Sequence, residues 1–186
     1  PCCLGDVIMA TAAVSAVRRR YAGAHLTFIT GAWSLEAVAN NPHLNSTAQW
    51  DWSEGGRVAA LWRLVALLRN GRYDAVLVLD RSPLLGLAAL VAGVAIRAGM
   101  DSDGRGFSLT HPARTIPGRH EALLYLDVAA QLKVDIITTE LQVVPADADL
   151  AWAHERLGTG EWVALHGAAA RVDVHVQWGA RLLRRA

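Results

Sequence analysis

The chain has 186 residues, of which 53% are hydrophobic and 19% are charged, and its formal net charge at pH 7 is +1. This length and composition are typical of a folded α/β protein that buries one good core, and they exclude an intrinsically disordered chain. A net charge so close to zero gives no overall attraction for nucleic acid, so we expect no nucleic-acid partner.

The cysteines and the hydropathy pattern predict the cellular compartment of the protein. Cys2 and Cys3 are the only cysteines, and neighbours in sequence rarely form an unstrained disulfide, which favours a reducing cytoplasm. No stretch has the order of a signal peptide, and the longest uncharged stretch, residues 82–96, is shorter than the ~20 residues that span a bilayer. We therefore expect a cytoplasmic protein, with peripheral docking at the inner face of the cytoplasmic membrane left open.

The front of the chain is predicted to alternate helix and strand. Residues 7–21 have an alanine-rich helical pattern, and residues 25–30 are typical of a short strand. Ser34 is the predicted N-cap of a helix that reaches Asn40. Leu4-Gly5-Asp6 is then the turn from a first strand into the first helix.

The middle of the chain continues this alternation. Residues 57–70 carry a helical stripe of apolar side chains, and residues 84–92 form a second apolar helix. Between them, residues 75–80 form a continuous apolar run that favours a strand covered on both faces, as in parallel sheets. A short strand near Ile96 is followed by a predicted loop over residues 99–118, which are rich in glycine and charge.

The last part of the chain contains two more predicted helices and two more strands. A long helix is expected over residues 119–132, followed by a strand over residues 141–144. Residues 146–157 are helical in pattern, Gly158-Thr159-Gly160 interrupts them, and residues 162–166 have the pattern of a fresh strand.

These elements predict an α/β fold with a doubly wound, Rossmann-like parallel sheet, whose ligands lie at the carboxyl ends of the strands. We place residues 1–158 in one such domain and residues 159–186 at the start of a second, which is too short to bury its own core. We also expect the first strand, in front of Leu4, to be largely missing, so that the chain is a fragment. Functional residues are expected in the strand-to-helix turns, at residues 4–6, 30–34 and 80–83 and in the loop after Ile96.

The Leu4-Gly5-Asp6 turn has an ordinary structural interpretation. Glycine permits a tight turn, and an aspartate at the start of a helix caps free amides and favours the positive end of the helix dipole. The motif alone therefore indicates a helix start and no particular chemistry.

Longer blocks of the sequence resemble family 9 glycosyltransferases, the heptosyltransferase-like enzymes. The most specific block is residues 4–31, LGDVIMATAAVSAVRRRYAGAHLTFITG, which resembles the start of these enzymes. The resemblance continues in order through GRYDAVLVLDRSP, VAGVAIRAG, RGFSLTH and RHEALLYLDVAAQLKV, and more weakly into WVALHGAAARVDVHVQWG. It covers nearly the whole chain.

The resemblance implies a GT-B architecture of two Rossmann-like domains, in which the first binds the acceptor sugar and the second binds a nucleotide-activated sugar. It implies a metal-independent, inverting transferase that moves a heptose-like sugar from a nucleotide-diphosphate donor to a lipopolysaccharide-core or other cell-envelope glycan. The partners would be the nucleotide sugar, which is a substrate rather than a cofactor, and a glycan or glycolipid acceptor. The fragment alone is expected to be inactive.

The resemblance also assigns roles to the first turn. It implies that Asp6 is the general base on the acceptor hydroxyl, with Gly5 beside it in the acceptor site. A carboxylate suits this role, because the attacking hydroxyl must lose its proton as it bonds to the anomeric carbon. A pure helix cap remains the competing interpretation of Asp6.

Four further basic residues are candidate acceptor ligands. Charge-assisted hydrogen bonds from such side chains bind anionic groups, whereas the alternative for each is a solvated loop charge. The four are Arg81, Arg97, Arg105 and His111.

Neither the histidines nor the tryptophans add a second site. His120-Glu121 begins a predicted helix, but position 124 is Leu124 rather than the histidine that a zinc motif requires, so no metal site is predicted. The seven tryptophans have two interpretations, stacking on sugars or packing in the core, and we favour the core for Trp62.

The end of the chain departs from the family pattern. The resemblance assigns the donor phosphates to the turn of His166, Gly167 and Ala168, whose backbone amides suit anions. Family members usually carry a lysine further on, where this chain has Val176, which offers no charge to a diphosphate. The alternative function is therefore a catalytically degenerate domain that binds a glycan or a partner. A flavodoxin-like regulator fits the sheet pattern but does not explain RGFSLTH.

Overall fold

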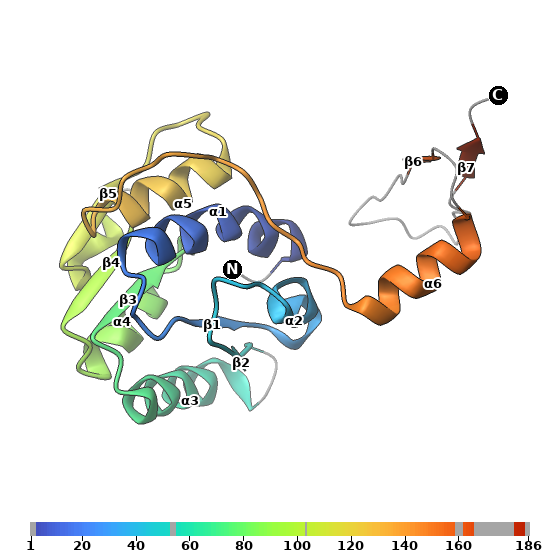
Figure 1. Ribbon diagram of the computed structural model, residues 1–186. Helices are drawn as coiled ribbons and strands as arrows, with labels where there is room; N and C mark the ends of the chain where they lie inside the picture. Colours follow the sequence, from blue (N-terminus) through green and yellow to red (C-terminus); the bar gives the residue numbers. More distant parts are fainter. Residues whose placement is uncertain (1–2, 53–54, 103, 159–161, 166–180, 185–186) are drawn as a thin grey trace. The chain divides into compact units, whose positions relative to one another are not determined.

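The computed structural model describes residues 3–52, 55–102, 104–158, 162–165 and 181–184 (Figure 1). The chain forms two compact units, Pro1–Val144 and Pro145–Ala186, here called unit 1 and unit 2. The domain boundary after residue 158 stays a prediction. None of the helices formed by the described residues has the length and apolarity that a membrane crossing requires.

Unit 1 alternates helices and strands. Its elements are α1 (Leu4–Arg20), β1 (Thr27–Thr30), α2 (Ala32–Ala39), β2 (Ser46–Gln49), α3 (Gly56–Gly71), β3 (Ala75–Val78), α4 (Pro83–Val91), β4 (Ile96–Asp101), the 3-10 helix η1 (Arg105–Ser108), β5 (His111–Arg114) and α5 (Glu121–Ala130). Unit 2 contains α6 (Asp147–Leu157) and the antiparallel pair β6 (Trp162–Leu165) and β7 (Arg181–Arg184).

The strands of unit 1 form two parallel sheets. β1 pairs with β2, with Thr27 opposite Ser46, and the second sheet has the order β3-β4-β5, with Ala75 opposite Ile96. β1 connects to β2 through α2 and β3 to β4 through α4, as is usual for parallel neighbours, whereas β4 connects to β5 through the short 3-10 helix η1. The predicted α/β class with parallel strands is confirmed.

Helices cover both faces of these sheets, which gives unit 1 three layers (Figure 1). α1, α2 and α5 lie on one face, whereas α3 and α4 lie on the other. α1 and α5 lie side by side, because the packed face of α1 consists largely of alanines such as Ala10 and Ala13, which are fully buried. α5 contributes large side chains to the same core, among them Leu126 and Val128, and burying each such side chain stabilises the fold by roughly 1.5–3 kcal/mol.

Several predicted elements differ from the structure. β2 was not predicted, because its residues Ser46–Gln49 are mostly polar and show no apolar alternation. The predicted loop over residues 99–118 instead contains the end of β4, all of η1 and β5. The predicted strand over residues 141–144 is wrong, since this stretch pairs with no strand and its Gln142 amide donates to Thr11 Oγ1 at 2.8 Å.

Two predictions about helices are also corrected. α2 begins at Ala32 after the N-cap Gly31, so Ser34 is a buried residue inside the helix and not its cap. Trp62 lies on the outer side of α3 with 60% of its surface exposed, so its assignment to the core was wrong. A helical stripe alone does not show how wide the buried face is.

Candidate active site

Asp6 lies in the first turn of α1. The helix begins at Leu4, and Cys3 is its N-cap in an extended conformation, with φ −100° and ψ 145°. Asp6 is therefore not the capping residue, although its negative charge lies at the favourable end of the helix dipole. The side chain is half-buried, and within the described part of the chain its carboxylate makes no hydrogen bond or ion pair.

Gly5 lies beside Asp6 on the surface. It is part of the helix, and its φ is not in the left-handed region, so the tight turn proposed as the reason for this glycine is not present. A Cβ atom at this position would meet no other atom within 4 Å. The absence of a side chain therefore leaves the backbone next to Asp6 open to a ligand.

Arg81 follows the carboxyl end of β3 and pairs with Glu121 at the start of α5. The distance from Arg81 Nη2 to Glu121 Oε2 is 2.7 Å. The side chain of Arg81 is 54% exposed and that of Glu121 only 20%, so the carboxylate is the more fixed partner. The hydrogen bond that Arg81 donates to Glu121 raises the pKa of Arg81 despite partial burial, and the nearby charge of Asp6 adds to this effect.

Tyr125 lies one helical turn beyond Glu121 and is only 2% exposed. Burial raises the pKa of its hydroxyl, and the charges of Asp6 and Glu121, together with a hydrogen bond to Glu121, raise this pKa further. Asp6 and Glu121 thus act on the same buried hydroxyl. We call Asp6, Arg81, Glu121 and Tyr125 the carboxyl-edge cluster.

Glu121 and Tyr125 were missed as site residues by sequence reasoning. Glu121 was considered only as part of a zinc motif, and Tyr125 matched an ordinary apolar helix position. Their spacing of four residues on one helix face was the available signal. The neighbouring His120 is the N-cap of α5, with its Nδ1 accepting from the Ala122 amide at 3.3 Å.

Two of the predicted acceptor ligands lie at the other end of the strands. Arg97 is the second residue of β4, and its side chain donates to the backbone carbonyls of Val94, Ala95 and Ser108, the last at 2.6 Å. His111 is the first residue of β5, and its Nδ1 lies 2.8 Å from Thr110 Oγ1. The structure does not bring either residue to Asp6.

The remaining predicted ligands lie outside the described residues. This applies to the side chain of Arg105, whose backbone begins η1, and to the donor residues His166, Gly167 and Ala168. Val176 lies outside them as well. Among the side chains that the structure describes, no group of three histidine, cysteine or acidic residues is arranged to hold a metal ion.

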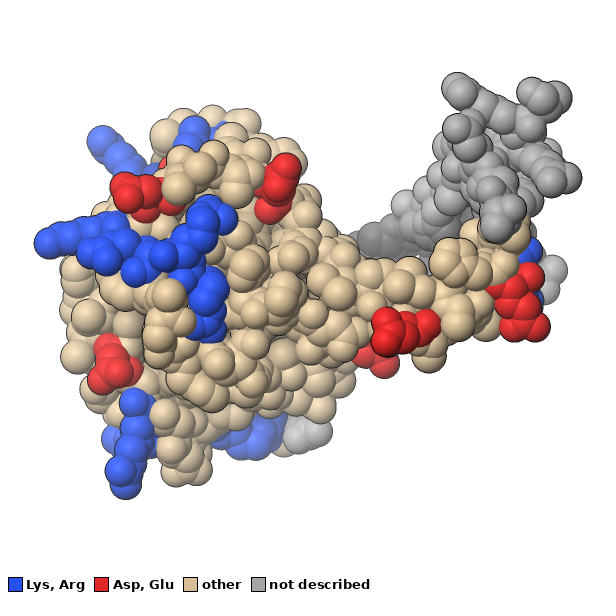
Figure 2. Space-filling model, in the orientation of Figure 1, with Lys and Arg blue, Asp and Glu red and all other residues tan. Residues whose placement is uncertain are grey.

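Charge is unevenly distributed over unit 1. On the face that Figure 2 presents, basic side chains gather over one area with acidic side chains near it, and uncharged atoms cover most of the remainder. This mixture agrees with the overall net charge of +1. Local pairs such as Arg81 and Glu121 therefore matter more here than a long-range field.

Two of the solved structures that share this fold show what the chain is similar to. The first is the ADP-heptose lipopolysaccharide heptosyltransferase II of E. coli, with a TM-score of 0.67 and 19% sequence identity over 85% of this chain and 49% of that protein. The second is a family 9 glycosyltransferase from Veillonella parvula, with a TM-score of 0.70 and 21% identity over 82% of this chain and 45% of that protein.

The chain has the fold of the first part of a family 9 glycosyltransferase. The predicted GT-B-type fold is thereby confirmed, and the chain spans about half the length of the two structures. No family model matches the sequence, and no curated protein matches it. At these identities the comparison establishes the fold, whereas the chemistry has to be argued from the residues of this chain.

Proposed function

We propose that this chain is the acceptor-binding part of a glycosyltransferase, with Asp6 as the general base. One observation carries the proposal. In a fold shared with sugar transferases, a carboxylate that no group in the described part of the chain binds lies within electrostatic reach of an exposed guanidinium, at the edge where ligands of parallel sheets bind.

The proposed reaction uses Asp6 to take the proton of an acceptor hydroxyl. As that hydroxyl oxygen bonds to the anomeric carbon of the donor, its proton passes to the Asp6 carboxylate. The bond between the anomeric carbon and the diphosphate oxygen breaks, and the electron pair leaves with the nucleoside diphosphate. Attack from the side opposite this leaving group inverts the anomeric centre.

Arg81 would orient the acceptor. A guanidinium carries five N–H donors, and the hydrogen bond from Arg81 to Glu121 uses only its Nη2. With more than half of its side chain exposed, Arg81 can offer its remaining donors to an oxygen or anionic group of the acceptor. Glu121 would hold the guanidinium in place, and Tyr125 would hold Glu121.

The finer assignments rest on the family resemblance and on the likeness to the E. coli enzyme. We propose a nucleotide-diphosphate heptose-like sugar as donor and a lipopolysaccharide-core or other cell-envelope glycan as acceptor. We also propose that transfer inverts the anomeric centre, that it needs no metal or other cofactor, and that it takes place in the cytoplasm at the inner membrane face.

A second candidate function is favoured by Val176. Because the family resemblance expects a lysine for the donor phosphates at that position, its replacement by valine favours a domain that binds a glycan without transferring a sugar. The two candidates share the acceptor site and differ in whether the donor is used.

The deciding experiment uses a protein that carries this chain together with a complete second domain. It is incubated with a panel of nucleoside-diphosphate sugars and envelope glycans, and products are followed by mass spectrometry, with and without a metal chelator. We expect transfer of one sugar, unaffected by the chelator. Glycan binding without transfer would establish the second candidate, and neither binding nor transfer would contradict both.

A further inference from the structure

Three tryptophans gather at the carboxyl ends of β1 and β2. Trp33 lies in the first turn of α2, directly after β1, and Trp50 and Trp52 follow β2. All three line one cavity of about 410 Å³, and so does Asp80, which follows β3. We call Trp33, Trp50, Trp52 and Asp80 the tryptophan group.

Trp33 is the most exposed large hydrophobic side chain in the described part of the chain, with 82% of its surface accessible. A single exposed apolar side chain needs no explanation by itself. Here, however, the exposed ring belongs to a concave lining that contains two further tryptophans and a carboxylate. Ligand sites have this composition, in which apolar and aromatic side chains surround a few polar groups.

The other two rings are held in place by their neighbours. Trp50 Nε1 donates to the Ala60 carbonyl of α3 at 2.8 Å. Trp52 lies edge-to-face against Trp50, with the ring centroids 4.9 Å apart, and the guanidinium of Arg57 lies 5.4 Å from the centroid of the Trp52 ring. A ring that is already fixed loses little side-chain freedom when a ligand binds to it.

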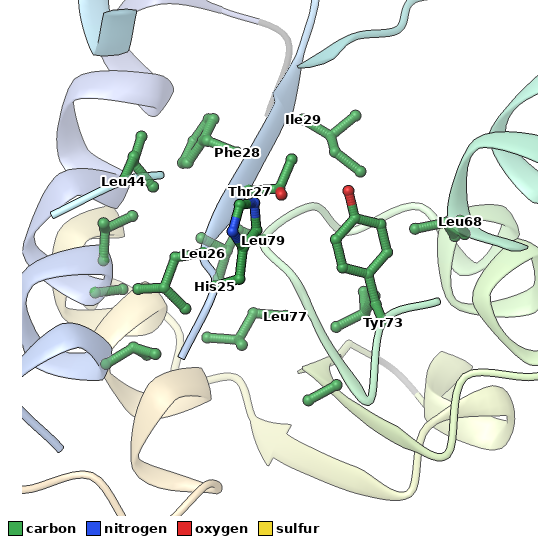
Figure 3. Close-up of a pocket in the computed structure, with 15 residues that line it drawn as sticks. His25, Leu26, Thr27, Phe28, Ile29, Leu44, Leu68, Tyr73, Leu77 and Leu79 are labelled. Atoms are coloured by element: carbon green, nitrogen blue, oxygen red, sulfur yellow. The ribbon is translucent and has the colours of Figure 1, made fainter. Parts of the chain in front are cut away.

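The lining changes toward the amino ends of the same strands. A second cavity there, of about 180 Å³, is lined mainly by aliphatic side chains, among them Leu26 and Leu44 (Figure 3). No tryptophan and no acidic side chain is found among the described residues that line it. Such a lining is typical of a protein interior. Tryptophan rings and a carboxylate are thus combined only at the carboxyl edge, where ligands of parallel sheets bind.

This combination of groups suits a sugar ring. A pyranose has an apolar C–H face and hydroxyl groups around its rim. The face of an indole ring is the negative part of its quadrupole and attracts such C–H groups, and a carboxylate accepts strong hydrogen bonds from hydroxyls. Asp80 is half-buried, and its Oδ1 accepts from the Ser82 amide at 2.7 Å, which orients the carboxylate. Because a carboxylate has about four acceptor positions, it can also bind a hydroxyl.

The tryptophan group adjoins the carboxyl-edge cluster. Asp80 is followed directly by Arg81 of that cluster, and consecutive Cα atoms are ~3.8 Å apart. The two groups nevertheless use different strand ends, since the tryptophans follow β1 and β2. An acceptor that reacts at Asp6 therefore has to extend beyond its reacting sugar residue in order to reach the tryptophans.

We propose that Trp33 and Trp52 stack on a second sugar residue of the acceptor, and that the hydroxyls of this residue donate to Asp80. The acceptor is then a glycan of at least two sugar residues, and Trp50 is a positioning residue that holds Trp52. This inference rests on the proposed function, because it takes the reacting sugar residue to lie at Asp6. It also separates Trp33 and Trp52 from Trp62, which does not line the cavity.

Binding of glycans of different length to this chain tests the assignment. The probes are deacylated lipopolysaccharide core oligosaccharides of one, two and three sugar residues, and the readout is the NMR signal of each indole Nε1–H. With the two longer probes, the signals of Trp33 and Trp52 should shift and that of Trp62 should not. Affinity should rise at least ~10-fold from the one-residue probe to the two-residue probe.

Substitutions then identify the stacking ring. Trp33→Ala should lower affinity for the two-residue probe roughly 10-fold and leave affinity for the one-residue probe unchanged. Trp33→Phe keeps an aromatic face and should recover most of the loss. Trp62→Ala is the matched control, because Trp62 is also exposed but lies on the outer side of α3, and it should bind as the unsubstituted chain does. Denaturant unfolding verifies that each variant is folded.

Several results would overturn the proposal. They are equal affinity of Trp33→Ala and the unsubstituted chain for the two-residue probe, an equal loss in Trp62→Ala, and binding of none of the probes. Exposed tryptophans also bind membrane interfaces. Trp33→Ala that retains its affinity for the glycan but no longer binds vesicles of anionic lipid would assign Trp33 to a membrane contact and overturn the proposal.

Sugar transfer, measured in a protein that also carries a complete second domain, separates this inference from the proposed function. Trp33→Ala should lower kcat/KM roughly 10-fold for the two-residue acceptor only. Transfer with the same kcat/KM in Trp33→Ala would overturn the inference and leave the proposed function intact. Glycan binding that depends on Trp33 without any transfer would support the inference and contradict the transferase.

Discussion

The two ends of the parallel strands in unit 1 use arginine in opposite ways. At the carboxyl end, Arg81 is more than half exposed and pairs with the side chain of Glu121. At the amino end, Arg97 donates to three backbone carbonyls. Arg18, at the end of α1, likewise donates to the carbonyls of His43, Ala22 and Ala24. An arginine bound to carbonyls fixes the fold, whereas one with free donors is able to bind a ligand.

Among the arginine substitutions that distinguish the carboxyl ends of the strands from their amino ends, we expect Arg81→Ala to have the largest effect. Loss of a hydrogen bond to a charged group costs ~1.5–3 kcal/mol, so acceptor affinity or kcat/KM should fall roughly 10- to 100-fold. The free energy of unfolding should change by less than about 1 kcal/mol, because the Arg81 side chain that is removed is more than half exposed. Isothermal titration and denaturant unfolding measure the two quantities.

Arg119→Ala is the matched control for this substitution. Arg119 pairs with Asp127 of α5 at 2.6 Å, so its removal also breaks an ion pair of this helix. Acceptor affinity should be retained in this variant. An equal loss of affinity in both variants would show that helix integrity, and not contact with the acceptor, explains the effect of Arg81→Ala.

Arg97→Ala should show the reverse pattern. Because the substitution leaves carbonyls of the loops around β4 without their donor, we expect the free energy of unfolding to fall by about 2 kcal/mol, with acceptor affinity unchanged. Arg97→Lys keeps the charge but not the planar fork of donors, and should recover only part of the loss. A stable Arg97→Ala variant with weakened acceptor binding would instead support the prediction that Arg97 binds the acceptor.

Tyr125 gives a smaller effect that depends on pH. The pKa of its hydroxyl is raised in the folded state above the ordinary tyrosine value of about 10, so the unfolded chain loses this proton first as the pH rises. Stability is thus fully present below about pH 10 and falls above it, by up to ~1.4 kcal/mol per pH unit. Denaturant unfolding should be measured from about pH 8 to about pH 11, a range that brackets the ordinary tyrosine pKa. The free energy of unfolding should show this slope, and Tyr125→Phe should remove it.

The absorbance of tyrosinate provides an independent check. The chain has three tyrosines, and native protein at alkaline pH should show fewer ionised tyrosines than unfolded protein. Ionisation of all three in the native state at the same pH as in the unfolded state would contradict the burial of Tyr125 against Glu121.

The smallest effect is expected at His43, near the amino end of the strands. Partial burial lowers its pKa below 6.5, and the charges of Arg19 and Arg18 lower it further. The unfolded chain therefore takes up this proton first, and stability is lost as the pH falls below about 6.5. His43→Gln should reduce the acid sensitivity of unfolding, whereas an unchanged pH profile would show that His43 is not responsible for it.

The parallel fold and two members of the carboxyl-edge cluster could be predicted from the sequence, because the patterns that indicate them are local. Asp6 and Arg81 both follow recognisable strand-to-helix positions, which local patterns reveal. Glu121 and Tyr125 reach the same place only because α5 packs beside α1, a contact between segments far apart in the sequence. Local pattern cannot supply that contact.

The errors in the predicted elements have a similar origin. β2 is a strand because it pairs with β1, although Ser46–Gln49 carry little β-pattern of their own. Residues 141–144 carry an apolar pattern but lie unpaired, with the Gln142 amide bonded to the Thr11 side chain. In both places tertiary pairing overrides local propensity.

The central claim is that sugar transfer takes place at the carboxyl edge of the parallel strands. Comparing Asp6→Asn with Asp74→Asn tests this claim most directly. Asp74 is exposed at the amino end of β3, so its substitution removes a charge of the same kind at the opposite edge. In a protein that carries this chain and a complete second domain, Asp6→Asn should lower kcat for sugar transfer by at least ~100-fold, whereas Asp74→Asn should leave it within about two-fold. Unchanged transfer in a folded Asp6→Asn variant would contradict the account.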